Sequence, residues 1–163
     1  MKAGTRKLVL FSLVVAGALG AANGVRAGGE IGNARYVKFR SALGGYETEY
    51  PRTWNNFDLG EIVGFMEDGV DAKLATNVGI TRHDLGQVQS LDDLKAYVAS
   101  KHPYLLPQST EVDGRPGYLV QWRGKTSIYV FRGPAAVMQI SYQIRADEQS
   151  RMDVEKILSS IKF

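Results

Sequence analysis

Apolar and polar residues alternate with a period of two along most of the chain after residue 35, a pattern typical of β-strands that bury one face. The predicted strands cover residues 36–40, 46–50, 62–66, 74–81, 109–112, 118–122, 127–132 and 138–144. Turn-forming pairs separate several of them, namely Gly44-Gly45, Asp113-Gly114 and Gly124-Lys125. We therefore expect one continuous β-layer between Tyr36 and Ile144.

The period changes to that of a helix in two places. The first predicted helix follows Ser90, with Asp93 completing a Ser-x-x-Asp capping box, and Pro103 marks its end. The second follows Ser150, with Asp153 in the equivalent position. Their apolar positions have helical spacing and are Leu91, Leu94, Val98, Val154, Ile157, Leu158 and Ile161. Strands, a helix, more strands and a closing helix predict an α+β domain with a largely antiparallel sheet.

The first 27 residues have the pattern of a cleavable signal peptide. Lys2, Arg6 and Lys7 precede the apolar run 8–22, and small residues lead to a cleavage position after Ala27. The run is shorter than the roughly 20 residues that a spanning helix needs, so we expect no stable membrane span after cleavage. These features predict export, to the periplasm of a Gram-negative bacterium, with a flexible leader at 28–35 and a single domain at 36–163.

The net charge argues against nucleic acid as a partner. The whole chain has 20 basic and 17 acidic residues, and residues 1–27 hold four of the basic ones and none of the acidic ones. The remaining 16 and 17 give a net charge near −1, with no electrostatic footprint for nucleic acid or anionic lipid. The chain has no cysteine, so stability must come from a packed core without disulfides.

The region 45–54 reads Gly-Tyr, then Tyr-Pro-Arg-Thr-Trp at its end. It resembles the aromatic strand followed by Tyr-Pro-x-x-Trp that opens PsbP-like and Mog1-like domains. The same order of elements continues at residues 66–68, 77–80, 90–93 and 157–163. The last of these resembles the family's closing helix and Ser-Phe-x-Phe strand, with Ile161 in place of a Phe.

This resemblance implies an α/β/α sandwich with a central, mostly antiparallel sheet. Family members include luminal extrinsic proteins of photosystem II, a nuclear Ran-binding factor and exported bacterial proteins of the DcrB or DUF1795 type, and none is a recognised enzyme. Because a shared fold does not transfer function, the partner stays open. We expect a monomeric, non-catalytic binding or accessory module that contacts an envelope protein. The alternatives are a small-ligand or metal-binding periplasmic protein and an extrinsic photosynthetic subunit.

Candidate catalytic chemistry is sparse. No G-x-S-x-G nucleophile elbow and no cysteine occurs, so we expect neither an enzyme nor a cofactor. The alternative of a metal site depends on His83, Asp84 and His102, which would have to converge in the fold. Ordinary surface or loop histidines are the competing interpretation.

Aromatic residues give the candidate partner surface, which we assign to Trp54, Tyr118, Trp122 and Tyr129. Two helices leave part of the sheet uncovered, and an exposed group of aromatic side chains is typical of a protein-binding surface. For Trp54, the competing interpretation is structural, with the ring anchoring the corner after Pro51 against the sheet. For the other three residues, the competing interpretation is that each ring flanks the core and keeps its polar end in water.

Overall fold

The structure is a computed structural model, and it describes residues 35–163. The predicted signal peptide and nearly all of the predicted leader lie outside these residues. The strands and helices are β1 (Tyr36–Ser41), β2 (Tyr46–Pro51), β3 (Trp54–Asp58), β4 (Ile62–Glu67), β5 (Asn77–Asp84), α1 (Leu91–Lys101), β6 (Gln108–Val112), β7 (Arg115–Trp122), β8 (Lys125–Gly133), β9 (Ala136–Gln143) and α2 (Glu148–Ser160). Neither helix has the length and apolar character needed to cross a membrane.

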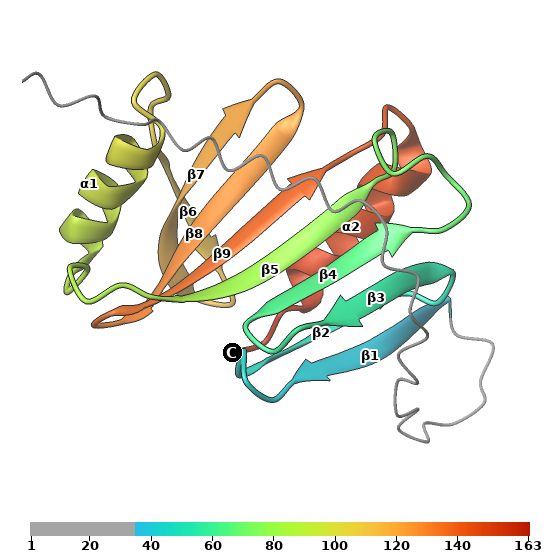
Figure 1. Cartoon of the computed structure of the whole chain (residues 1–163), viewed down its shortest axis with the longest axis horizontal. Helices are drawn as coiled ribbons and strands as arrows, with labels where there is room; N and C mark the ends of the chain where they lie inside the picture. The colour runs from blue at the N-terminus through green and yellow to red at the C-terminus, as the bar shows by residue number, and fades with distance from the viewer. Residues whose placement is uncertain (1–34) are drawn as a thin grey trace, which may run out of the picture. The chain divides into compact units, whose positions relative to one another are not determined.

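Seven of the strands form one antiparallel sheet in the order β3-β4-β5-β9-β8-β7-β6 (Figure 1). The last strand of the chain, β9, lies in the middle of it, between β5 and β8. The predicted α+β class with an antiparallel sheet is confirmed. The prediction of one continuous β-layer is wrong, because β1 and β2 form a separate two-stranded ribbon that pairs with no strand of the main sheet. Outside the ribbon, Glu47 of β2 bridges to Lys162 after α2.

The ribbon is separate because its aromatic face packs against the main sheet. The Phe39 ring meets the Phe65 ring edge-on at 5.3 Å between centroids, and the Tyr50 ring lies 4.8 Å from Phe65. Pro51 ends β2, since proline has no N–H to continue the ladder. Alternation thus identified β1 and β2 as strands but did not show that they form a sheet of their own.

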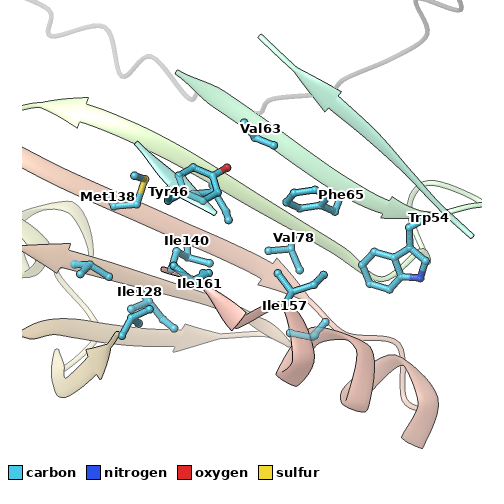
Figure 2. Packing of buried hydrophobic residues seen from close by; sticks show 14 residues of the cluster. Tyr46, Trp54, Val63, Phe65, Val78, Ile128, Met138, Ile140, Ile157 and Ile161 are labelled. Atoms are coloured by element: carbon cyan, nitrogen blue, oxygen red, sulfur yellow. The ribbon is translucent and has the colours of Figure 1, made fainter. Parts of the chain in front are cut away.

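The main sheet is covered on both faces, as an α/β/α arrangement requires. Alternate residues of β8 point to opposite faces: Val130 belongs to the core that contains Ile157 of α2, and Tyr129 to the core that contains Leu94 of α1. We call these the α2 face and the α1 face. Figure 2 shows the α2-face core, where side chains from the strands, from α2 and from Tyr46 of the ribbon fill one layer.

The two helix starts were predicted with different success. The Ser90 cap is confirmed, because its Oγ accepts a hydrogen bond from the Asp93 N–H and donates one to the Asp93 carboxylate. The second cap is Asp147 rather than Ser150, since the Asp147 carboxylate accepts from both the N–H and the hydroxyl of Ser150. Ser150 is therefore in the first turn.

Two strand assignments also change. The strand predicted from residue 74 begins at Asn77, because the N–H groups of Leu74 and Ala75 bond instead to the carbonyl of Asp71 in a turn. The strand β3 was not predicted at all. Its only buried side chain is that of Trp54, and the polar residues after it give no clear alternation.

Candidate functional site

Most of the predicted partner surface is buried. Trp54 lies in the α2-face core, and Tyr118 and Tyr129 lie in the α1-face core. Of the four aromatic residues chosen from the sequence, only Trp122 is open to solvent, with 56% of its surface exposed. The assignment is corrected for the other three residues. The helix α1 covers Tyr118 and Tyr129, and Trp54 is buried within the α2-face core. For Trp54, the structural interpretation agrees with its burial.

The three residues considered for a metal do not come together. The Nε2 of His83 is hydrogen-bonded to Oε1 of Gln139 at 2.9 Å, and the Nε2 of His102 to the hydroxyl of Tyr129 at 2.9 Å. Asp84 follows His83 in β5, so its side chain points to the other face of the sheet. Within residues 35–163, no group of three His, Asp or Glu side chains is placed to hold a metal ion.

A pocket of about 340 Å³ opens on the α1 face, between the end of α1 and the β7–β8 hairpin. We call it the α1 pocket. It is lined by Lys101, His102, Pro103, Tyr104, Leu105, Val120, Trp122, Lys125 and Ser127. One wall forms where α1 stops at His102, whose N–H bonds to the carbonyl of Val98, and Pro103 turns the chain away toward β6.

The opposite wall depends on the turn between β7 and β8. Arg123 and Gly124 both have positive φ angles, 48° and 77°, as a two-residue type I′ hairpin turn requires. The turn therefore lies one residue earlier than the Gly124-Lys125 pair predicted from the sequence. As a result Trp122 and Lys125 are cross-strand partners, and their side chains project from the same face of the hairpin.

Two exposed ring side chains of the pocket lining, together with the exposed Leu106 that follows the lining residue Leu105 in the chain, form what we call the apolar trio. Tyr104 is 97% exposed, Leu106 88% and Trp122 56%. The Arg123 guanidinium lies 4.5 Å from the centre of the Trp122 ring, a cation–π contact that supports the ring. Side chains of this kind, exposed together, are typical of surfaces that bind another molecule.

The pocket is positively charged. The described residues of its lining include two lysines and a histidine but no Asp or Glu. Among residues 35–163, neither Lys101, Arg123 nor Lys125 forms an ion pair. Burial, and then the charge of Lys101, lowers the pKa of His102 below its ordinary 6.5, so the imidazole is neutral at neutral pH. Burial raises the pKa of its partner Tyr129 to about 12.

A row of small side chains runs from the pocket across the sheet, and we call it the small-residue row. Val120 of the pocket is paired with Ser127, Ser127 with Ser141, and Ser141 with Gly79, so all four lie on the α1 face. The helix α1 packs against β7 and β8, and in the described part of the chain no helix packs over the part of the row on β9 and β5. The two serine hydroxyls are 3.0 Å apart, and the Gln139 amide donates to Ser141 at 2.9 Å.

The arrangement suits binding better than acid–base chemistry. Ser127 and His102 both line the pocket, but each makes its hydrogen bond elsewhere, to Ser141 and to Tyr129. In the described part of the chain they do not form the hydrogen-bonded pair that would activate a serine. What the pocket offers is cationic groups, ring surfaces and hydroxyls.

Sequence reasoning missed Lys101, Leu106 and Lys125 as site residues. The stretch between Pro103 and Pro107 carried a usable signal, since Tyr-Leu-Leu is unusually apolar for a loop. The lysines carried none, because their proximity to Trp122 depends on how the hairpin and α1 are placed.

Comparison with known proteins identifies the fold. No protein-family model matches the chain, and no curated protein matches it. Among solved structures, the cyanobacterial PsbP (CyanoP) of Synechocystis sp. PCC 6803 is similar with a TM-score of 0.55 and 15% identity, over 85% of this chain and 98% of that one. A protein of Bacteroides thetaiotaomicron is similar with a TM-score of 0.51 and 15% identity, over 79% of this chain and about half (48%) of that one. The protein thus has a PsbP-like α+β fold.

Proposed function

We propose that this protein is an exported, non-catalytic binding module that recognises an envelope protein through the α1 pocket and the apolar trio. The observation that carries the proposal is the exposure of Tyr104 and Trp122 in the lining of one open pocket, with Leu106 exposed two residues after Tyr104. Holding three such side chains in water is unfavourable, and covering them with a partner recovers roughly 25 cal/mol per Å² of apolar surface.

The residue types support contact with a protein. Tryptophan and tyrosine are among the side chains that contribute most to protein–protein binding, especially next to a depression that a partner side chain can fill. The Arg123 contact limits the motion of the Trp122 ring, so less side-chain entropy is lost when a partner binds. The positive N-terminus and apolar run of residues 1–27 support export.

The proposal extends to the kind of protein. We group the chain with exported bacterial proteins of the DcrB or DUF1795 type, on the Tyr-Pro-Arg-Thr-Trp motif at residues 50–54 together with the signal-like N-terminus. The compartment we propose is the periplasm, on the signal-like pattern of residues 1–27.

Position-specific photo-crosslinking in cells tests the proposal. A benzophenone amino acid replaces Tyr104 in one version of the chain and Met152, an exposed residue of α2, in another. We expect a discrete crosslinked protein from position 104 and none from position 152. Adding Trp122→Ala should abolish the adduct, and adding Leu59→Ala, another exposed apolar residue, should leave it. Equal adducts from both positions, or an adduct that persists in Trp122→Ala, would contradict the proposal.

A further inference from the structure

We infer that the α1 pocket accepts an acidic side chain with an apolar neighbour, carried on an extended segment of the partner protein. The inference rests on the proposed function and specifies what that partner must display. It follows from the charge of the pocket, from the position of the apolar trio and from the direction of the small-residue row.

The charge comes first. Lys101 and Lys125 line the pocket from opposite walls, Arg123 stands beside it, and the lining includes no Asp or Glu. The Lys101 ammonium lies 5.5 Å from the centre of the Tyr97 ring, and among the described residues neither lysine has an ion-pair partner. A carboxylate that enters the pocket would give them the charged partner that the described residues do not supply. Residues 35–163 as a whole carry 16 basic and 16 acidic side chains, so this positive site is a local feature of a neutral domain.

The apolar neighbour follows from the hairpin register. Trp122 is the cross-strand partner of Lys125, so a ligand whose carboxylate reaches Lys125 has the indole ring within one residue's distance. Tyr104, on the other wall, offers a second ring that is almost fully exposed. An aromatic or large aliphatic side chain next to the acid would cover both rings.

The length of the small-residue row indicates that the ligand is an extended segment rather than a compact molecule. From Val120 through Ser127 and Ser141 to Gly79 it crosses three strand spacings, about 14 Å, which matches roughly four extended residues. Among the described residues, a Cβ built on Gly79 would meet no atom closer than the Ser141 carbonyl oxygen at 3.9 Å, so these residues leave the space above it open. Along the way the two serine hydroxyls and the Gln139 amide bond one another, and among the described residues one hydroxyl hydrogen and the second amide hydrogen of Gln139 are left for a peptide carbonyl.

A membrane surface fits the site less well. Binding to anionic lipid gains about 1 kcal/mol for each basic residue near the surface, and stable attachment needs a cluster of them. This site has three cations around a pocket in a neutral domain. The positive groups are placed for one or two carboxylates.

Synthetic peptides test the inference on the full chain. The probe is the fluorescent hexapeptide Gly-Ser-Glu-Phe-Ser-Gly, acetylated and amidated, and its matched controls carry Gln or Lys in place of Glu. By fluorescence anisotropy we expect the Glu peptide to bind at least about fivefold more tightly than the Gln peptide, with the difference shrinking as salt rises. The Lys peptide should bind more weakly still.

Matched variants separate the parts of the inference. Lys101→Gln and Lys125→Gln should each reduce the preference for Glu, Lys125→Arg should keep it, and Lys38→Gln, on the exposed side of β1, should change nothing. Gly79→Val, or Gly79→Ala if the larger residue lowers the melting temperature, should weaken the hexapeptide while leaving the capped dipeptide Glu-Phe unaffected.

Any other result of these binding experiments overturns a specific part of the inference. Equal binding of the Glu and Gln peptides, with both lost in Trp122→Ala, removes the acidic specificity and leaves the proposed function standing. A dipeptide that binds as tightly as the hexapeptide overturns the extended segment. No binding of the Glu peptide, or tighter binding to phosphatidylglycerol vesicles, overturns the inference as a whole.

Discussion

The ring of Phe57 occupies the space that a side chain at position 64 would need. The two residues are cross-strand partners in β3 and β4, and a Cβ built on Gly64 would meet three carbons of the Phe57 ring. Phe57 therefore lies flat on the α1 face near the edge of the sheet. Gly64 is paired with Gly79, so it continues the small-residue row by one strand. The Phe57 ring marks the end of that row.

This contact predicts a non-additive pair of substitutions. Gly64→Ala alone should destabilise the protein by about 1–3 kcal/mol, because the ring must leave its position. In a Phe57→Ala background the same change should cost much less, since the space is then free. Urea unfolding of the four proteins of this double-mutant cycle gives the coupling free energy directly. Gly79→Ala is the control, and we expect it to be close to neutral. Additive effects would show that the ring moves away freely.

A second prediction concerns the core of the α2 face. Phe65 is fully buried there among Phe39, Tyr50 and the residues of α2, so Phe65→Ala should cost about 3–5 kcal/mol of unfolding free energy. Leu59→Ala, on an exposed side chain, should change it by less than about 0.5 kcal/mol. Similar effects from the two would mean that the aromatic ribbon does not pack on the sheet as described.

A third prediction is a pH dependence that originates at His102. Burial and the charge of Lys101 lower its pKa in the folded state, so the unfolded chain binds more protons near and below the ordinary value of 6.5. The stabilisation is therefore present above pH 6.5 and is lost as the pH falls through the folded pKa. Melting temperatures between about pH 7.5 and 5 should decrease in the parent chain and decrease less in His102→Gln. A parallel decrease in both proteins would assign the effect to other groups.

A fourth prediction concerns an acidic group, Asp147, whose pKa is lowered in the folded protein. Hydrogen bonds from Arg145 and from Ser150 lower the pKa of Asp147 to about 2. For an acid with a depressed pKa, the stabilisation is present above the unfolded value and is lost as the pH falls toward 2. Asp147→Ala should lower the melting temperature at pH 7, and the difference from the parent should shrink in acid. Asp147→Asn should retain more stability than Asp147→Ala, because asparagine also caps helices. If the two variants melt alike, Asp147 is not the cap.

The sequence predicted which segments form strands and helices better than it predicted how those elements pair and pack. Alternation identified the strand predicted from Met138, and the Ser-x-x-Asp spacing identified the Ser90 cap, because both patterns involve residues close together in the chain. The cap of α2 was misplaced, since Asp147 and Ser150 are both good caps and only the helix geometry distinguishes them. The strand β3 was missed because one buried Trp54 in a polar segment gives no period.

The site was less predictable for a physical reason. Alternation correctly indicates that Tyr118 and Trp122 lie on the same face of β7. It does not indicate that α1 covers Tyr118 but does not extend over Trp122. Lys101 and Lys125 line one pocket only because the turn falls at Arg123-Gly124 and α1 stops near Pro103. Such long-range placement depends on tertiary packing rather than on local pattern.

Recognition at the α1 pocket is tested most directly by mapping amide chemical shifts in the nitrogen-15-labelled protein as the Glu hexapeptide is added. We expect the largest changes at Lys101, Tyr104, Lys125, Ser127 and Ser141, with none around Met152 on α2. Changes centred on α2 or on the β1–β2 ribbon would place recognition on the opposite side of the sheet and contradict recognition at the α1 pocket.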